Sequence, residues 1–378
     1  MTALRTRPLG STDPRAPARH IDWSIVLVCL ALSVIGVAAI YSATQRSLTA
    51  AGDDPFFYGQ RQITFLAVGL TAAVITWFVD HKVLRDWSAQ LYAVTMLSLV
   101  AVLVLGREIN GATSWFQLPG FQLQPSEFAK LSVIVALAAF VSASGPGAGL
   151  DRFVTGLAIA GAPMLLILAQ PDVGTMLVFV AITMGIFLVG GARASHIVGA
   201  TVVAIVGVTA VLTLGLLPEP QEARLTSFLN DDAPEEYRYN GEQSEIAIGA
   251  GGLTGRGWLE GTQTSGDFVP EQHTDFIFTA VAEEFGFVGA GTVLTLYAFL
   301  IWRLWRLAAL ARDGFGTLVI LGVLSMFMFQ IFQNVGMTVG VMPITGIPLP
   351  FLSHGGSSTI MAWTAIGLVL GVHARRFR

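Results

Sequence analysis

Long apolar runs alternate with short polar segments along almost the whole chain. The runs are about 17–25 residues long, the length that an α-helix needs to cross a hydrocarbon core of about 30 Å. The pattern therefore predicts an all-α polytopic membrane protein, with residues 23–374 forming a single ten-helix transmembrane domain. The ten transmembrane helices are expected at about residues 23–44, 60–79, 87–106, 126–143, 153–169, 173–190, 195–217, 275–301, 314–340 and 354–373.

The composition supports this class. Of the 378 residues, 53% are hydrophobic and 12% are charged, and the mean hydropathy is +0.67. Soluble domains carry about 25% charged residues, so a soluble globular protein is excluded. The single cysteine, Cys29, lies inside the first apolar run and cannot form an internal disulfide. Nothing in the sequence resembles the basic footprint of a nucleic-acid-binding protein, and no nucleic-acid partner is expected.

The positions of lysine and arginine predict the orientation of the helices. With the N-terminus inside, most of the 21 Lys and Arg residues fall on segments that face the cytoplasm, which is the bias that sets membrane topology. Both termini are therefore expected in the cytoplasm, as a disordered tail at 1–22 and a short tail at 375–378. The long polar segment at 218–274, between predicted helices 7 and 8, is then extracytoplasmic.

Three polar segments fall on this predicted outer side. The first, 218–274, is too long for a simple connection, and its residues 242–249 favour a short amphipathic or re-entrant helix. The second is 107–127. The third is 342–358, where three prolines exclude a regular helix. Irregular backbone at membrane depth is tolerated where it lines a cavity, so the convergence of these segments predicts a functional site.

Asp275 stands where the segment 218–274 enters the eighth predicted helix, and Glu283 and Glu284 follow about two turns deeper. A carboxylate at mid-bilayer costs roughly 2.5–3.5 kcal/mol on insertion scales, so such groups usually face a cavity or a partner. Asp275 is therefore a candidate reactive group. It could instead be a helix-terminal carboxylate, a role that Thr274 could also serve, and the two glutamates could pair with a neighbouring helix.

The other two outer segments supply further candidates. Lys130 lies on the same helix face as Glu127, so it is either half of a structural ion pair or a point charge for a phosphate. Trp115 belongs either to the interfacial aromatic belt or to a substrate site. Gly355 and Gly356 would let backbone amides approach a ligand closely.

Asp172 and His273 stay open between structural and functional roles. Asp172, in a short outer turn, is a candidate for coordination or hydrogen bonding, and His273 is either a surface residue or a ligand or base. The glycine-rich stretch 249–257 is not a nucleotide-binding loop, because no strand precedes it and no Lys-Ser/Thr pair follows. No nucleotide cofactor is expected, and the six histidines lack the spacing of a structural zinc site.

Four motifs follow one another along the chain: Gln-Pro-Ser-Glu-Phe-Ala-Lys at 124–130, Gln-Pro-Asp-Val-Gly-Thr at 170–175, Pro-Glu-Gln-His-Thr-Asp-Phe-Ile-Phe at 270–278 and Gly-Ile-Pro-Leu-Pro-Phe-Leu-Ser-His-Gly-Gly-Ser at 346–357. Together they closely resemble the SEDS family (shape, elongation, division and sporulation), over essentially all ten predicted helices. The residues at 261–263 and 345–348 are more similar to its RodA branch than to its FtsW branch.

The resemblance implies a peptidoglycan glycosyltransferase in the bacterial cytoplasmic (inner) membrane, with its active site facing the periplasm. It would polymerise lipid II into β-1,4-linked glycan strands during cell-wall elongation and rod-shape maintenance, with undecaprenyl pyrophosphate as the leaving group. The implied partners are lipid II, a polyprenyl-linked glycan, membrane lipids, a class B penicillin-binding protein and other elongation-complex proteins. A lipid II flippase or transporter, and a scaffold without chemistry, are the alternatives.

The resemblance also assigns residues. The essential aspartate of the family matches Asp275, its motif tryptophan matches Trp115, and its motif lysine matches Lys130. The chain departs from the family at Gln122, where members often carry a basic residue, and at His354, where many carry tyrosine. The other residues expected to bind substrate are Gln124, Ser126, Glu127, Asp172, Arg256, His273, Thr274, Glu283, Ser353, Gly355 and Gly356.

The chemistry expected at such a site is base-assisted glycosyl transfer. Asp275 would accept the proton of the 4-hydroxyl of an incoming GlcNAc. The leaving pyrophosphate would be stabilised by Lys130, by Arg256 or by a Mg²⁺ or Mn²⁺ ion. The sequence leaves the role of Asp275 open between a general base and a metal ligand.

Overall fold

The computed structural model describes residues 20–109, 112–118, 121–145, 149–213, 235–266 and 268–376. Most of the tail predicted at 1–22, residues 377–378 and the first part of the segment 218–274 lie outside these ranges. The described helices are α1 (Trp23–Ala51), α2 (Phe57–Phe78), α3 (His81–Asp86), α4 (Ser88–Leu105), α5 (Pro125–Ser144), α6 (Leu150–Leu168), α7 (Val173–Val189), α8 (Ala194–Thr213), α10 (Glu235–Gly251), α11 (Thr262–Ser265), α12 (Ile277–Ala309), α13 (Gly314–Thr338) and α14 (Gly356–Ala374).

Eight of the described helices are long and apolar enough to cross a membrane, namely α1, α2, α4, α5, α6, α12, α13 and α14. Two more, α7 and the stretch Ala194–Gly207 of α8, are apolar but shorter. Large apolar side chains such as Val104, Leu105 and Phe287 are more than two thirds exposed, which is typical of surfaces that contact a membrane. The structure therefore supports a mostly helical protein with several membrane-spanning helices.

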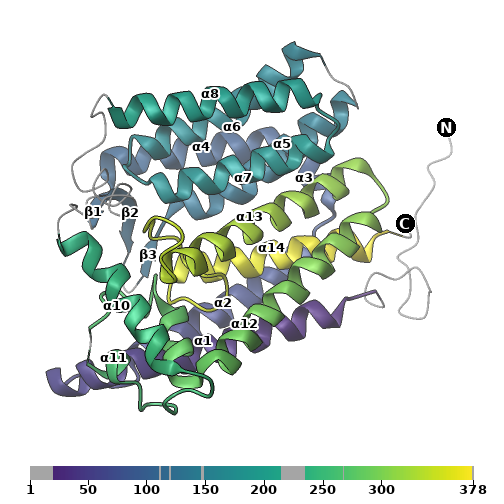
Figure 1. Ribbon diagram of the computed structural model, residues 1–378. Helices are drawn as coiled ribbons and strands as arrows, with labels where there is room; N and C mark the ends of the chain where they lie inside the picture. Colours follow the sequence, from purple (N-terminus) through teal and green to yellow (C-terminus); the bar gives the residue numbers. More distant parts are fainter. Residues whose placement is uncertain are drawn as a thin grey trace.

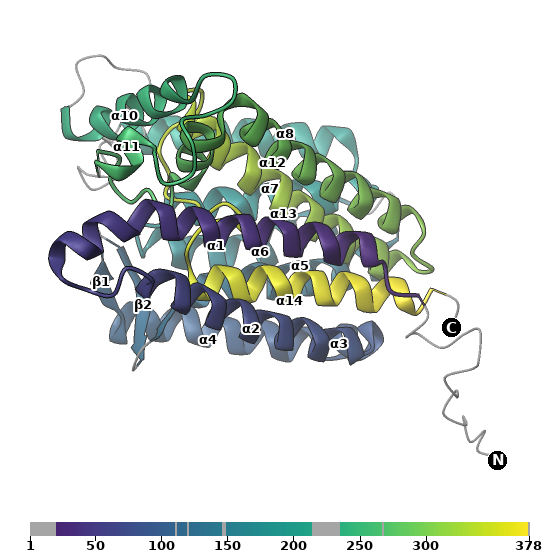
Figure 2. The ribbon, with the colours of Figure 1, turned by 90° about the horizontal axis from the view of Figure 1, so that it is seen from below.

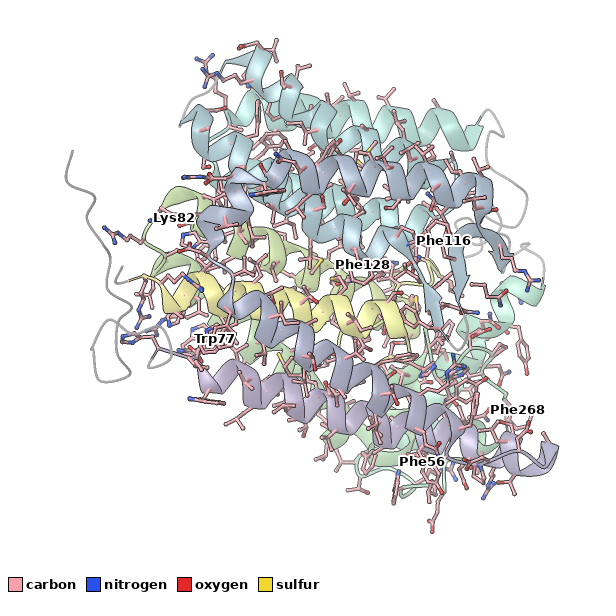
Figure 3. All side chains as sticks on the ribbon, turned by 180° about the vertical axis from the view of Figure 1, so that it is seen from behind. Phe56, Trp77, Lys82, Phe116, Phe128 and Phe268 are labelled. Carbon is pink, nitrogen blue, oxygen red and sulfur yellow. The ribbon has the colours of Figure 1, made fainter. Side chains whose placement is uncertain are left out.

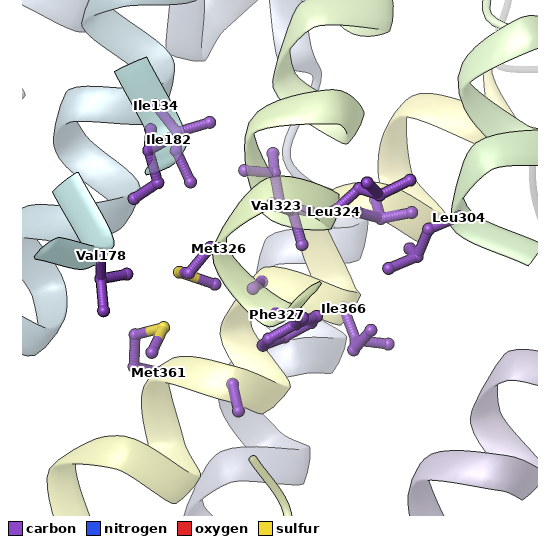
Figure 4. Close-up of a cluster of buried hydrophobic side chains, with 14 of the residues drawn as sticks. Ile134, Val178, Ile182, Leu304, Val323, Leu324, Met326, Phe327, Met361 and Ile366 are labelled. Carbon is purple, nitrogen blue, oxygen red and sulfur yellow. The ribbon is translucent and has the colours of Figure 1, made fainter. Parts of the chain in front are cut away.

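The long helices lie side by side in one bundle (Figures 1 and 2). At its centre α14 packs against α2, and α13 packs against α5, α7 and α12. Figure 4 shows part of the core, where Ile134 of α5, Ile182 of α7, Met326 and Phe327 of α13 and Ile366 of α14 gather. The strands, α10 and α11 lie at one end of the bundle, and the start of α1 and the end of α14 lie at the other.

The outer segment 107–127 differs from its prediction. Residues before α5 form a three-stranded antiparallel sheet of β1 (Arg107–Ile109), β2 (Ala112–Leu118) and β3 (Phe121–Leu123). The expectation of an all-α protein was therefore wrong for this segment. The sequence contains the reason, because Asn-Gly at 110–111 and Pro-Gly at 119–120 are turn signals.

Two helices shape the polar segment that leads to Asp275. α10 covers the short helix predicted at 242–249 and extends beyond it at both ends. α12 is interrupted at Gly286, where φ is 64° and ψ is −161°, a conformation that glycine adopts far more readily than other residues. The N–H groups of Phe287 and Val288 donate to the carbonyls of residues 252–253 at 2.9 and 3.1 Å. The interruption of α12 thus attaches the outer segment to the bundle.

Candidate active site

The three outer segments surround one cavity of about 470 Å³, at the end of the bundle that carries the strands and α10 (Figure 1). Its wall combines the start of α2, the sheet, the start of α5, the turns before α7 and α12, and the connection between α13 and α14. Of the residues predicted from the sequence, the wall contains Trp115, Gln124, Glu127, Asp172, His273, Thr274, Asp275, Gly355 and Gly356. These residues come from four segments that lie far apart in the chain.

Asp275 stands half-buried on the turn before α12. Its N–H donates to the carbonyl of Glu271 at 3.0 Å. Its carbonyl accepts a hydrogen bond from Nδ2 of Asn334 at 2.7 Å, and the same Nδ2 donates to the carbonyl of Ile347 at 2.8 Å. Gly346 has a φ of +67°, and a Cβ there would lie 3.3 Å from Oδ2 of Asp275. The side-chain amide of Asn334 on α13 thus holds both the turn before α12 and the connection between α13 and α14. Gly346 leaves room beside the carboxylate of Asp275.

Lys130 and Glu127 form a buried ion pair beside the cavity. Nζ of Lys130 lies 2.6 Å from Oε1 of Glu127, and the two side chains are only 1% and 2% exposed. The second oxygen, Oε2 of Glu127, has no hydrogen-bond partner in the part of the chain that the structure describes. Glu127 is part of the cavity wall, whereas Lys130 is not. Because a buried ammonium needs a partner, the pair has a structural role, and its cation lies immediately behind the wall.

Asp172 is held by protein groups at the same wall. Its Oδ1 accepts the N–H of Thr175 at 3.0 Å and so caps α7. Its Oδ2 accepts a hydrogen bond from Nε2 of Gln124 at 3.2 Å. Burial raises the pKa of Asp172, and the hydrogen bonds of Thr175, the charge of Lys130 and the Gln124 amide only partly offset this. The carboxyl therefore joins the turn before α7 to the start of α5.

Aromatic rings and one cation form a side of the cavity that sequence reasoning missed. The ring of Tyr58 lies 4.7 Å from that of His273 and 5.2 Å from that of His354. Burial, and then the charges of His273 and Arg61, lower the pKa of His354 to about 3, so this imidazole is neutral near pH 7. The guanidinium of Arg61 lies 5.4 Å from the ring centre of Phe57. A charged residue inside a predicted span was the signal that could have identified Arg61.

The two glycines before and at the start of α14 shape the wall. The N–H of Gly355 donates to Oε1 of Gln62 at 3.3 Å, and Nε2 of Gln62 donates to the carbonyl of Ser353 at 3.2 Å. The backbone N–H of Gly355, which the sequence suggested for a ligand, is therefore hydrogen-bonded within the protein. A Cβ at Gly356 would lie 2.6 Å from the ring of Phe121, so glycine there lets β3 pack closely on the helix start.

Glu283 lies away from the cavity, fully buried in α12. Its carboxylate accepts the N–H groups of Gln263 and Thr264, both at 2.8 Å. It also accepts the hydroxyls of Thr262 and Thr264, at 3.2 and 2.7 Å. The adjacent Glu284 accepts the hydroxyl of Ser42 and a backbone N–H. Both glutamates therefore connect the outer segment to the helices.

Three other predicted residues also lie outside the cavity wall. Arg256 is exposed, its Nε donates to the carbonyl of Ala250 at 3.0 Å, and its N–H donates to the carbonyl of Glu283 at 3.0 Å. Ser126 and Ser353 are buried. The hydroxyl of Ser353 accepts the N–H four residues earlier at 2.9 Å, so it stabilises the loop from behind.

A metal site is not preassembled in the described residues, since no group of three or more histidine, cysteine, aspartate or glutamate side chains there is placed to hold an ion. Mg²⁺ is often held by one or two carboxylates together with substrate phosphates and water. Asp275 on the cavity wall fits that pattern as a single protein ligand. The metal stays a prediction.

Comparison with known sequences gives one consistent family. A model of the FtsW, RodA and SpoVE cell cycle proteins matches residues 22–377. Stage V sporulation protein E of Bacillus subtilis is 37% identical over 356 residues, which cover 93% of this chain and 96% of that protein. Peptidoglycan glycosyltransferase MrdB of Escherichia coli K12 is 35% identical over 359 residues, which cover 94% of each chain.

Solved structures agree with the sequence comparisons. A chain from a study of the structural coordination of polymerization and crosslinking by a peptidoglycan synthase complex has a TM-score of 0.80 at 33% identity, covering 95% of this chain and 99% of its own. The rod shape determining protein RodA of Thermus thermophilus has a TM-score of 0.71 at 32% identity, covering 95% and 98%. The resemblance inferred from the four motifs is confirmed, and the chain belongs to the FtsW, RodA and SpoVE family of cell cycle proteins.

Proposed function

We propose that this chain is a peptidoglycan glycosyltransferase that polymerises lipid II into β-1,4-linked glycan strands. Relatives that match almost the whole chain bear that name. The observation that carries the proposal within the chain is the cavity in which Asp275, Trp115 and His273 meet. It combines a carboxylate, aromatic surface and hydrogen-bonding groups, as a site for a sugar carrying a pyrophosphate requires.

In the proposed reaction, Asp275 is the general base. The 4-hydroxyl of the acceptor GlcNAc attacks the anomeric carbon of the donor glycan, and its proton passes to the carboxylate of Asp275. The new glycosidic C–O bond forms as the C–O bond to pyrophosphate breaks, with inversion at the anomeric carbon. The hydrogen bonds that Asn334 donates to Asp275 and Ile347 hold the base in place for this step.

The charge on the leaving undecaprenyl pyrophosphate needs a cationic counterpart. Arg61 lies in the cavity wall, and its guanidinium suits bidentate binding of phosphate oxygens. Lys130 contributes from behind Glu127, whereas Arg256 lies outside the wall. A Mg²⁺ or Mn²⁺ ion, if bound, would be held by Asp275 and would supply further positive charge.

The proposed setting is the bacterial cytoplasmic membrane. Ten spans with both termini in the cytoplasm would place the Asp275 cavity on the periplasmic side, and the bias of Lys and Arg supports that orientation. A class B penicillin-binding protein is the proposed partner for crosslinking, supported by the match to a chain of a peptidoglycan synthase complex. The role in elongation and rod shape rests on the RodA-like motifs and on the match to RodA.

The test is polymerisation of labelled lipid II by the purified protein with its partner penicillin-binding protein, whose transpeptidase is blocked. Asp275→Asn is expected to reduce glycan formation by about 10²–10⁴-fold, the range that a general base contributes. Glu260→Gln, an exposed change in the same outer segment but outside the cavity wall, is the matched control and should retain activity. Removing divalent metal with a chelator separates a metal ligand from a metal-independent base.

Full polymerisation by a well-folded Asp275→Asn protein would overturn the assignment of the base. Absence of polymer from the wild-type pair would instead favour the flippase alternative, which is then tested by lipid II translocation in vesicles. A transporter needs polar groups along the whole depth of the membrane, whereas the Asp275 cavity lies at one end of the helices.

A further inference from the structure

A second cavity, of about 310 Å³, lies at the opposite end of the bundle from Asp275. It forms where the α2–α3 junction, the α12–α13 junction and the end of α14 meet. Figure 3 shows Lys82 at this end and Phe116 of the sheet at the other. The charged side chains that line the cavity are Asp80, Lys82, Arg312, Asp313, Arg375 and Arg376.

The two carboxylates in this cavity already have protein donors. Asp80 caps α3 by accepting the N–H of Lys82 at 3.0 Å, and Asp313 caps α13 by accepting the N–H of Gly316 at 2.7 Å. His81 lies between them, 3.4 Å from Asp80 and 3.0 Å from Asp313. Burial opposes ionisation of Asp313, but hydrogen bonds from Gly316 and His81 lower its pKa. Both acids therefore act as fixed structural anions.

Arg375 is a fixed cation on the inner side of the cavity. Its Nη1 donates to the carbonyls of Trp77 and Gly371 at 2.9 and 2.8 Å, and its Nη2 donates to the carbonyl of Phe78 at 2.6 Å. These contacts join the end of α14 to the end of α2. Its Nε also lies 3.8 Å from Oδ2 of Asp80, so this buried guanidinium is held by three carbonyls and pairs with one of the two carboxylates.

Lys82 and Arg312 differ from Arg375 in being exposed. Lys82 follows the α2–α3 junction, and Arg312 lies in the α12–α13 junction. Neither forms an ion pair with any residue that the structure describes. Among the lysine, arginine and aspartate side chains of the cavity, four cations stand against two carboxylates. The cavity thus has an excess of positive charge, carried by two side chains that can move toward a ligand.

Apolar side chains flank the cavity on the outside of the bundle. Phe78, Val83 and Leu310 are 67%, 50% and 50% exposed, and each is within a few residues of a residue that lines the cavity. At the end of a set of membrane-spanning helices, such side chains contact acyl chains while lysine and arginine remain at the headgroup level. The cavity therefore lies where lipid headgroups meet the protein.

We propose that this cavity binds the phosphate of an anionic phospholipid headgroup. Lys82 and Arg312 approach the phosphate from two sides, Arg375 supports it from within, and the acyl chains follow the exposed apolar side chains. Basic pockets between helices at a membrane surface suit such headgroups, and charge-assisted hydrogen bonds from lysine and arginine are the strong contacts to phosphate oxygens. The site is separate from the Asp275 cavity, so it does not depend on the glycosyltransferase proposal.

The test compares lipids retained by the purified full chain after incubation with an equimolar mixture of phosphatidylglycerol and phosphatidylcholine, counted by native mass spectrometry. The pocket variant is Lys82→Gln with Arg312→Gln. The matched control, Arg152→Gln with Arg193→Gln, removes two cations from the α6 start and the α7–α8 connection, outside the cavity. Wild type and control should retain the anionic lipid in preference, and the pocket variant should lose about fivefold of that preference for each charge removed.

Equal retention by the pocket variant and the control variant would overturn the proposal, because the cations would then act only through general surface charge or membrane orientation. A third arm of the experiment adds millimolar inorganic phosphate to the wild-type protein and to the pocket variant. If wild type binds phosphate through Lys82 and Arg312 but shows no preference for the anionic lipid, the lipid assignment is wrong. Thermal melting of each variant confirms that the proteins compared are folded.

Discussion

Asp275 and Glu283 are only eight residues apart, at one transition from polar to apolar sequence, but the fold surrounds them differently. Asp275 is half-buried in a cavity wall. Glu283 is fully buried, and four donors from residues 262–264 point at its carboxylate. A carboxylate offers about four acceptor positions, so the acceptor capacity of Glu283 is used within the protein.

The difference shows how a carboxylate in an apolar segment acquires a role. Removal of a carboxylate from water is costly and needs compensation, and the cost is greater for the fully buried Glu283 than for the half-buried Asp275. Glu283 receives this compensation from backbone amides and hydroxyls of its own chain, and so fixes the outer segment to α12. Asp275 is held instead through its backbone, by Asn334, with its carboxylate beside Gly346 at the cavity. The backbone anchor thus fixes the position of Asp275 at the cavity wall.

The variant Glu283→Gln tests the difference between the two acids, and we expect it to have the largest effect on stability. In either amide orientation, an NH₂ group faces the N–H of Gln263 or Thr264, which then lacks its acceptor. We expect a loss of about 3 kcal/mol in the free energy of unfolding, the upper end of the range for a buried donor left unsatisfied, and a melting temperature several degrees lower. Glu260→Gln, an exposed change in the same outer segment, is the control.

The comparison would fail if Glu283→Gln melted like wild type but polymerised no lipid II. Such a result would assign Glu283 a direct role in the reaction, as the sequence allowed, despite its distance from the cavity wall. Asp275→Asn should show the reverse pattern, with activity lost and melting temperature nearly unchanged.

The helices and the convergence of the three outer segments could be predicted from the sequence. Apolar runs of membrane length are a direct consequence of bilayer thickness, and polar residues beside them are rare enough to mark a site. Asp275 was predicted on that basis, Gly356 from the close approach that glycine allows, and Trp115 from the family resemblance, and all three lie in the cavity wall.

Pairings between distant segments could not be predicted in the same way. The four donors to Glu283 are backbone and hydroxyl groups about twenty residues earlier, with no sequence signature. Arg61 resembled one of the cations that lie at membrane interfaces. The strands at 107–123 are too short for a clear alternation of apolar and polar residues, so the turn signals at 110–111 and 119–120 were the only guide.

A second test examines whether backbone anchoring of Asp275 affects catalysis. Asn334→Ala removes the donor to the carbonyls of Asp275 and Ile347. We expect kcat for lipid II polymerisation to fall by about 10–100-fold, because small displacements of a catalytic group are costly, with little change in KM. Gln330→Ala, a buried amide one turn earlier on α13, should leave kcat much less affected. Equal kcat values for the two folded variants would reduce Asn334 to a structural residue.

The smallest effect concerns His354, on the ring-lined side of the cavity. Its pKa is lowered to about 3, first by burial, whereas an unfolded histidine has a pKa of about 6.5. Between these values the unfolded chain binds more protons, so this residue makes the protein less stable as pH falls below about 6.5, by about 1.4 kcal/mol per pH unit at most. His354→Tyr keeps a ring beside Tyr58 and removes this titration. The fall in melting temperature from pH 7 to pH 5 should therefore be smaller in the variant than in wild type, since carboxylates common to both proteins contribute equally. If the two proteins lose the same stability on acidification, the imidazole is not desolvated in the folded state and the ring-lined side of the cavity is open to water.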